Sequence, residues 1–428
     1  MSEEQNLRIQ KYDRNQIKNY GLKNRKTSGK EPKKVNFVFI SPHFPSHYVN
    51  FADRLKKMGV NVLGIADASY DSLTPELKNA LTEYYRVDNM ENYDEVMRAV
   101  AYFTFKYGRI DRLESFNEYW LELDAKLRTD FNIQGTRYPE VLESKRKYLM
   151  KNHFERAGVP SARCHCVTTR EEGAKFVKEV GYPVFVKPDI GVGAYASYSI
   201  KNEEEFNRFY DNYPSVPYVM EEFVNGLIVT FDGITNYENE PIFMTSHIFP
   251  ENVAETVNEG DDLRYYSVLK IDPALEKAGR AVLKSFDTSA RFFHFEFFKL
   301  YEDKKGLGKK GDYVALEVNM RPPGGCMPEL MNYEHDTDVY QMYADMIVHD
   351  RLYQPTEKKY IGIYVARKNR FNYVHTHEEI VEKYGYQLMQ YNEVDEIFSA
   401  VMGDHMYLMR AKTQEEADEI IRFVQEKC

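Results

Sequence analysis

The sequence predicts an α/β protein of several domains whose N-terminal part forms a parallel sheet. The first observation is length: the chain has 428 residues, and one hydrophobic core stops growing beyond roughly 250–300 residues. The second is that short apolar segments alternate with amphipathic helical segments along residues 35–143, which is typical of βαβ units. The composition, 43% hydrophobic and 29% charged, is that of a globular protein rather than a disordered or fibrous one.

The N-terminal sheet is expected to place two loops beside a ligand. Strands are predicted at 35–40, 61–65, 84–87 and 112–114, with helices at 48–58 and 93–107. Ligands of parallel sheets gather beyond the carboxyl ends of the strands. The loops 41–45 and 115–119 follow two of these strands, so we expect them to face a bound molecule.

The rest of the chain is expected to form further α/β segments. A helix at 145–157 is followed by Gly158 and then Pro160, the usual signature of a helix C-terminus. A second domain is therefore expected from residue 144, a further block of strands from residue 226, and a small α/β lobe at 351–428. The predicted strands are 163–167, 183–187, 197–200, 218–223, 228–235, 241–246, 294–300, 313–319, 360–367 and 405–411, and the predicted helices are 170–180, 203–210, 273–286, 376–384 and 414–426.

Charge and hydropathy argue against several classes of protein. The net charge is −10, which argues against a surface that binds nucleic acid. No apolar run approaches the roughly 18–20 residues that cross a bilayer, so no membrane association is expected. Four cysteines are too few for a disulfide framework in a chain of this length, which favours the cytoplasm.

Residues 1–34 differ from the rest and form a basic N-terminal arm. They hold ten Lys or Arg against four Asp or Glu. Such an arm either docks on an acidic partner or RNA, or is a solvated leader, and short charge-biased chain ends favour the leader.

Lys187 lies at the end of a predicted strand, and a loop with Gly191 and Gly193 follows it. Glycines let backbone N–H groups come close to phosphate oxygens, and a lysine adds a positive charge. No Gly-Lys-Ser/Thr follows the glycines, so the segment is not a Walker A loop. It is either a phosphate-binding loop of another kind or a plain turn between two strands.

Glu317, Asn319 and Arg321 alternate along the strand at 313–319 and just beyond it, so their side chains share one face. Carboxylate and amide oxygens suit a hard cation such as Mg²⁺, and a guanidinium suits the anion that the cation carries. The apolar neighbours favour a buried strand with a polar face over an exposed charge pair.

Glu296 lies within a run of phenylalanines, where a carboxylate is costly unless a cation or hydrogen bonds satisfy it. His294 shares its face of the strand and is one candidate partner. A Mg²⁺ ion shared with Glu317 is the preferred hypothesis.

The order of these segments resembles the ATP-grasp superfamily over residues 35–350. In chain order, a basic helix precedes Gly158-Val159-Pro160, a strand ends in Lys-Pro before a glycine loop, Glu-Glu-Phe-Val stands at 221–224, an acidic strand follows, and Glu-x-Asn-x-Arg-Pro begins at 317. The resemblance implies a pre-ATP-grasp α/β domain at 35–143 and an ATP-grasp domain at 144–350. The latter would divide into a lid lobe at 144–225 and a metal and catalytic lobe at 226–350, and the C-terminal α/β lobe would follow.

The resemblance also implies a set of site residues. The ATP phosphates would be bound by Lys147, Lys187 and the loop with Gly191 and Gly193, with Lys145 and Lys151 as alternatives to Lys147. The adenine would be bound by Glu221, Glu222, Phe223 and Val224, and one or two Mg²⁺ (or Mn²⁺) ions by Glu296, Glu317 and Asn319. The catalytic set would be Arg321, Lys187 and Arg264. Family members often carry a Glu for the ribose where this chain has Ile228, so either Asp232 takes this role or the ribose is held loosely.

The implied activity is that of an ATP-dependent carboxylate–amine ligase, which activates a small acid as an acyl phosphate for attack by an amine. A phosphotransferase that acts on a hydroxyl and a non-catalytic nucleotide-binding module are the alternatives. The implied partners are ATP, a small acid and an amine, and a homodimer is left open. No motif identifies the acid or the amine.

Overall fold

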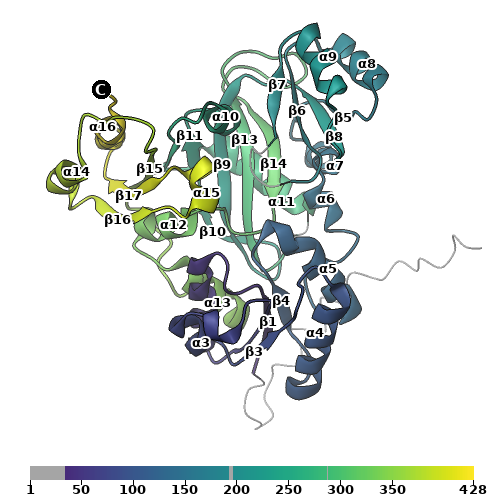
Figure 1. Cartoon of the computed structure of the whole chain (residues 1–428), viewed down its shortest axis with the longest axis vertical. Helices are drawn as coiled ribbons and strands as arrows, with labels where there is room; N and C mark the ends of the chain where they lie inside the picture. The colour runs from purple at the N-terminus through teal and green to yellow at the C-terminus, as the bar shows by residue number, and fades with distance from the viewer. Residues whose placement is uncertain (1–33, 192–195, 287) are drawn as a thin grey trace, which may run out of the picture.

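The computed structural model describes residues 34–191, 196–286 and 288–428, and it has the α/β architecture that the sequence predicts. The basic arm predicted at 1–34 lies outside the described residues, apart from Lys34. The described strands form three sheets: a front sheet near the N-terminus, a small sheet, and a large central sheet that runs into the C-terminal lobe (Figure 1).

The front sheet is parallel throughout, in the order β3-β2-β1-β4. Alternate residues of its central strand pack in opposite directions: Val38 packs in one core with Phe103, and Phe37 packs in another with Tyr343. Tyr343 lies on α13 (Val339–His349), so the front domain shares an apolar core with a helix from much later in the chain. The elements are β1 (Asn36–Ile40), β2 (Asn61–Ala66), β3 (Glu83–Arg86), β4 (Arg112–Glu114), α2 (Val49–Lys57), α3 (Pro75–Ala80), α4 (Tyr93–Tyr107) and α5 (Leu121–Asp130).

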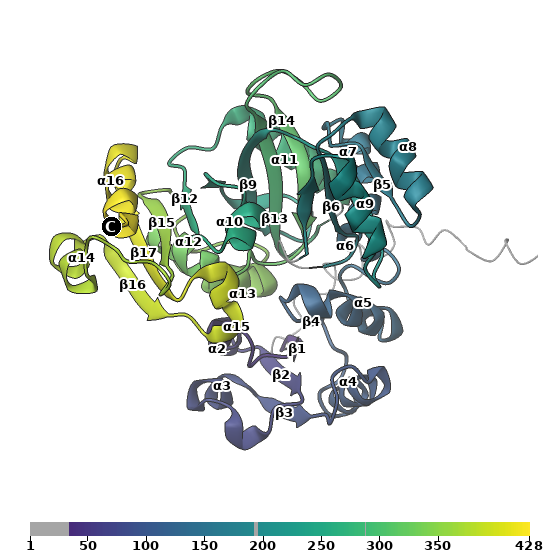
Figure 2. The ribbon, with the colours of Figure 1, turned by 45° about the horizontal axis from the view of Figure 1, so that its top comes forward.

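The small sheet is antiparallel, in the order β5-β8-β6-β7. Its outer face is covered by two helices, because Val184, Val186 and Met220 pack with Phe176 and Phe206 of those helices. Figure 2 shows both helices on the side away from the central sheet. The elements are β5 (Cys164–Cys166), β6 (Val184–Pro188), β7 (Tyr198–Ile200), β8 (Tyr218–Glu222), α8 (Arg170–Val180) and α9 (Glu203–Asp211).

The helix before the small sheet ends as the sequence predicts. It is α7 (Lys147–Ala157), and the short α6 (Leu142–Lys145) precedes it. Gly158 follows it with φ 67°, a left-handed conformation that glycine adopts without a steric penalty.

The central sheet has nine strands, in the order β14-β13-β9-β11-β12-β15-β17-β16, with β10 also paired to β9. Its first strands are β9 (Gly226–Thr235), β10 (Pro241–Thr245), β11 (His247–Phe249), β12 (Arg264–Ser267), β13 (Phe292–Leu300) and β14 (Tyr313–Asn319). Its helices are α10 (Val253–Glu259), α11 (Pro273–Phe286) and α12 (Met327–His335).

The C-terminal segment adds its strands to this same sheet, because β15 pairs with β12. The sequence predicts a lobe at 351–428 but not that its strands continue the central sheet. Its elements are β15 (Ile361–Arg367), β16 (Leu388–Glu393), β17 (His405–Ala411), α14 (His377–Tyr384), α15 (Glu396–Met402) and α16 (Gln414–Gln425). In the part of the chain that is described, none of the helices combines the length and the apolar character of a membrane span.

Candidate active site

A buried ion triplet lies on the inner face of the small sheet. The Nζ atom of Lys187 lies 2.7 Å from Oε2 of Glu221, and the Nζ atom of Lys151 lies 2.7 Å from Oε1 of the same carboxylate. Burial works to raise the pKa of Glu221, but the two ammonium groups outweigh it and lower that pKa to about 2. Burial also disfavours the charge on Lys187, yet the carboxylates of Glu221 and Glu317 raise the pKa of its ammonium. Glu221 and Lys187 are therefore both charged at neutral pH.

Strand alternation separates Glu221 from Glu222. Phe185 pairs with Glu221 and Lys187 with Val219, so Lys187 and Glu221 share the inner face. Glu222 lies on the other face, where its two carboxylate oxygens accept hydrogen bonds from N and Nη2 of Arg163, each at 2.8 Å. The structure therefore does not bring the Glu222 side chain to the lysines, and its implied place at the adenine edge stays a prediction.

The next two residues of that predicted edge lie against the hairpin at 301–312. Val224 is buried with Leu300, Leu307 and neighbouring apolar residues. The carbonyl of Phe223 accepts a hydrogen bond of 2.9 Å from Nζ of Lys304.

Lys147 lies at the start of α7 and contacts two separate segments. Its Nζ atom donates to the carbonyl of Gly191 at 3.3 Å and lies 3.8 Å from Oε1 of Glu317. Asp189 holds the start of the helix next to the glycine loop, since its Oδ2 atom accepts from Nε of Arg146 at 2.7 Å. The position of Gly193 lies outside the described residues.

The predicted metal ligands lie side by side on β13 and β14. Glu296 pairs with Glu317, and His294 pairs with Asn319, so these four side chains share a face. Burial works to raise the pKa of Glu296, but His294, Lys187 and Arg321 together lower it. Within the described ranges, no group of three or more His, Cys, Asp or Glu side chains could hold a metal ion alone.

Arg321 is held in a fixed orientation just beyond β14. Its Nε atom donates to Oε2 of Glu118 at 2.9 Å, Nη1 to the carbonyl of Pro322 at 2.9 Å, and Nη2 to Oδ1 of Asn319 at 3.1 Å. The side chains of Arg321 and Glu118 are 14% and 12% exposed. Glu118 begins a short 3₁₀ turn, Glu118–Trp120, within the front-domain loop predicted to face a ligand. Residue types alone do not reveal this contact, because the pair is separated by 203 positions.

Asp232 does not lie beside the adenine edge. It is fully buried, its Oδ1 atom is 2.6 Å from Nδ1 of His294, and its Oδ2 atom is 2.8 Å from Nδ1 of His247. Nε2 of His247 lies 2.8 Å from Oε1 of Glu334. The two histidines lower the pKa of Asp232 against the effect of burial. Both carboxylate oxygens of Asp232 are thus engaged by histidines, on the same face of the sheet as Glu296, and the structure does not support the implied ribose contact.

Arg264 lies away from the other predicted catalytic residues. Its guanidinium forms an ion pair with Glu251, and its Nη1 atom donates to Oε1 of Gln425 at 3.2 Å. It lines a surface pocket of about 410 Å³ beside α16. Strand alternation turns the next residue, Tyr265, to the opposite face, where its ring stacks on Tyr364 with centroids 4.6 Å apart. The implied catalytic contact of Arg264 is therefore not found.

The chain is similar in sequence and in fold to several known proteins. Residues 146–216 match the family described as carbamoyl-phosphate synthase L chain, ATP binding domain. The L-arginine-specific L-amino acid ligase of Bacillus subtilis is 25% identical over 158 residues, which is 37% of this chain and 37% of that protein. The crystal structure of an L-amino acid ligase from Bacillus licheniformis covers 93% of this chain and 98% of its own, with a TM-score of 0.71 at 13% identity. The chain has the ATP-grasp fold.

A second solved structure has the same fold. The biotin carboxylase domain of the 2-oxoglutarate carboxylase from Hydrogenobacter thermophilus matches 92% of this chain and 89% of its own, with a TM-score of 0.61 at 16% identity. By contrast, the sequence matches span less than half of the length of the curated relatives. In this fold, Lys187 of the candidate site lies on the small sheet and Lys147 lies on α7. The carboxylates of Glu296 and Glu317 lie on β13 and β14.

Proposed function

We propose that the protein is an ATP-dependent ligase that converts a small carboxylic acid into an acyl phosphate, which an amine then attacks to give an amide, ADP and phosphate. The observation that carries this proposal is that Nζ of Lys147 lies 3.8 Å from Oε1 of Glu317, while the charge of Lys187 acts on the carboxylates of both Glu317 and Glu296. Three segments far apart in the sequence thereby supply positive charge for phosphates and oxygen ligands for a cation. The guanidinium of Arg321 lies just beyond β14, the strand that carries Glu317.

The lysines have the role of neutralising the triphosphate. Lys147 lies between the glycine loop and β14, and Lys187 lies on the inner face of the small sheet, where its charge acts on Glu317. Phosphates that enter here compete with Glu221 for Lys187. Charge neutralisation and alignment by such groups are the main contributions of a protein to phosphoryl transfer.

The carboxylates on β13 and β14 are suitable ligands for a magnesium ion. Glu296 and Glu317 present carboxylates from paired positions, and Asn319 presents an amide oxygen on the same face, a donor set of hard oxygens that Mg²⁺ prefers. Mn²⁺ fits the same set. Because the protein offers too few ligands alone, the phosphate oxygens of the nucleotide would complete the coordination, and the ion would supply further charge neutralisation.

The names of the relatives point to amino acids as the acid and the amine. The matched proteins of Bacillus subtilis are described as an L-arginine-specific L-amino acid ligase and an alanine–anticapsin ligase. Arg321 suits the oxygens of a carboxylate that is being activated. We also place the protein in the cytoplasm, which agrees with four free cysteines.

A substrate screen tests this proposal. ADP and phosphate release is measured with ATP, Mg²⁺ and pairs of amino acids, with each acid alone and with ATP alone as controls. We expect release to need the acid and to rise when the amine is added, and mass spectrometry to find an amide. Phosphate transferred to a hydroxyl, without release of free phosphate, would instead indicate a phosphotransferase.

A further inference from the structure

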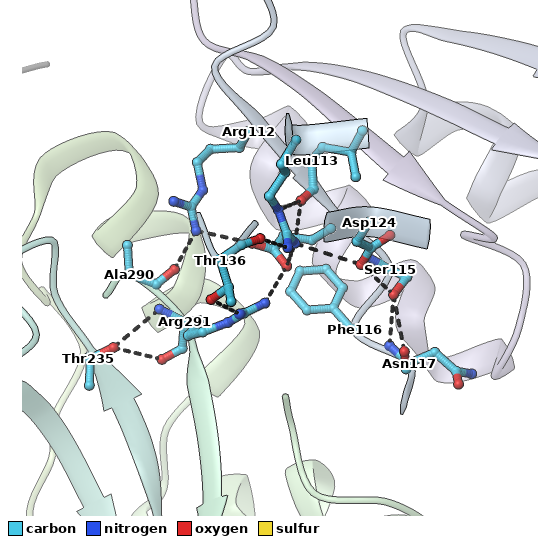
Figure 3. A network of polar contacts seen from close by, with 12 residues as sticks. Arg112, Leu113, Ser115, Phe116, Asn117, Asp124, Thr136, Thr235, Ala290 and Arg291 are labelled. Carbon is cyan, nitrogen blue, oxygen red and sulfur yellow. Dashed lines mark hydrogen bonds and ion pairs between the residues drawn. The ribbon is translucent and has the colours of Figure 1, made fainter. Parts of the chain in front are cut away.

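The front domain is bound to the central sheet by a buried cluster at the end of β4 (Figure 3). Oε2 of Glu114 accepts hydrogen bonds from Nη2 of Arg128 at 2.6 Å and from Nη2 of Arg291 at 2.9 Å. Its Oε1 atom accepts from Nη2 of Arg112 at 3.1 Å, and that nitrogen also donates to the carbonyl of Ala290 at 2.6 Å. Arg291 directly precedes β13, the strand that carries Glu296. The cluster therefore fixes the end of β4 relative to the start of β13.

The loop after Glu114 is also held firmly. The backbone N and Oγ of Ser115 both donate to Oδ2 of Asp124, at 2.9 and 2.7 Å. Phe116 has φ 59°, a conformation that a bulky residue adopts only where its surroundings enforce it. Its ring is buried, and its carbonyl accepts a hydrogen bond of 2.9 Å from the hydroxyl of Tyr48. Two residues later, Glu118 thus starts from a fixed backbone position.

We propose that Glu118 is a positioning residue, which acts from the front domain by fixing the orientation of the Arg321 guanidinium for the substrate. This inference rests on the proposed ligase function. A guanidinium has five N–H groups, and three of those on Arg321 are used by Glu118, Asn319 and Pro322. Among the residues that the structure describes, one N–H on each terminal nitrogen is therefore left for the oxygens of an acyl or phosphoryl group. Because Glu118 takes the Nε edge, it determines where those two N–H groups point.

This role predicts a kinetic effect that a purely structural contact would not have. With Glu118→Gln, the carboxylate that orients Arg321 is lost, while Lys147 and Lys187 are untouched. We expect kcat to fall about 100-fold, as for a small misplacement of a reacting group, while the KM for ATP stays unchanged. Glu118→Asp keeps the charge and should recover part of the rate. Glu122→Gln is the matched control, since Glu122 forms an ion pair with Lys126 on the surface of α5, and it should behave as wild type.

A double-mutant cycle shows whether Glu118 acts through Arg321. Glu118→Gln is introduced into the wild type and into Arg321→Lys, and kcat is measured in all four proteins. We expect the Glu118 substitution to cost much less in the Arg321→Lys background. Equal cost in both backgrounds, or an unchanged kcat in Glu118→Gln, would overturn the proposal. A wild-type protein that releases no ADP with any acid would overturn the proposed function itself and this role with it.

Discussion

The ammonium of Lys187 lies 2.7 Å from Oε2 of Glu221, and the two side chains are 5% and 4% exposed. Lys151 shares the carboxylate from its other side. A buried charge without a partner is strongly destabilising, so this triplet keeps Lys187 charged while no nucleotide is present. A phosphate group that binds Lys187 then takes over a position that Glu221 holds in the free protein.

Glu221→Gln should change how the stability of the protein depends on pH. The pKa of Glu221 is about 2, against an ordinary value of 4.5, so ionised Glu221 stabilises the fold above about pH 4.5, and this contribution is lost as the pH falls towards 2. The full contribution is about 3 kcal/mol. Urea unfolding of the wild type and of Glu221→Gln is measured at about pH 6 and about pH 3. The difference between their free energies of unfolding should be smaller at the lower pH.

Glu179→Gln is the control for this measurement. Glu179 is exposed and lies 3.4 Å from Arg163, an arrangement of little energetic value. The free energy of unfolding of Glu179→Gln should differ little from that of the wild type at both pH values. If the free energies of unfolding of Glu221→Gln and the wild type differ by the same amount at both pH values, the stabilising role of the triplet is contradicted.

Lys187→Ala should weaken ATP binding. A charge-assisted hydrogen bond contributes about 2 kcal/mol, so the dissociation constant should rise about 30-fold. Calorimetric titration with ATP and Mg²⁺ measures this effect directly. Lys178→Ala, on the exposed side of α8, is the control, and equal affinity in Lys187→Ala would refute the phosphate role.

Glu317→Gln should abolish turnover and leave much of the nucleotide affinity. The substitution removes the charge of Glu317, which lies opposite Glu296 on the neighbouring strand, but it leaves the lysines in place. ADP release and calorimetry together separate the two effects. The control is Glu302→Gln, whose carboxylate accepts a hydrogen bond from exposed Asn225. Normal turnover of Glu317→Gln would remove the metal assignment.

Arg264→Ala should leave kcat unchanged. Its partners are Glu251 and Gln425 at the surface beside α16, and an exposed pair of this kind contributes about 0.5 kcal/mol to stability. Steady-state ADP release measures the effect. A large loss of kcat would show that Arg264 reaches the reacting groups after all.

The sequence alone predicts the fold class and the residues whose role depends on their own strand. Lys187 ends a predicted strand before a glycine loop, and alternation assigns Glu296 and Glu317 to polar faces of their strands. In the structure the charge of Lys187 acts on both carboxylates. The same alternation distinguishes Glu221 from Glu222, so their separation onto opposite faces follows from the strand that the sequence predicts.

Positions that depend on distant partners could not be predicted in this way. Arg264 lies on β12, a strand of four residues that the sequence does not indicate, so the side of the sheet it takes was undetermined. Asp232 is fixed by histidines on two other strands. The contact of Glu118 with Arg321 depends on how the front domain packs on the central sheet, which no local pattern contains.

The most direct test of the ligase proposal is the transfer of an oxygen atom. If the acid is activated as an acyl phosphate, one of its carboxylate oxygens leaves with the phosphate when the amine attacks. A substrate acid labelled with ¹⁸O in its carboxylate is turned over with ATP and the amine, and the released phosphate is analysed by mass spectrometry. We expect one labelled oxygen in each phosphate released. Phosphate without label, formed together with the amide, would contradict it.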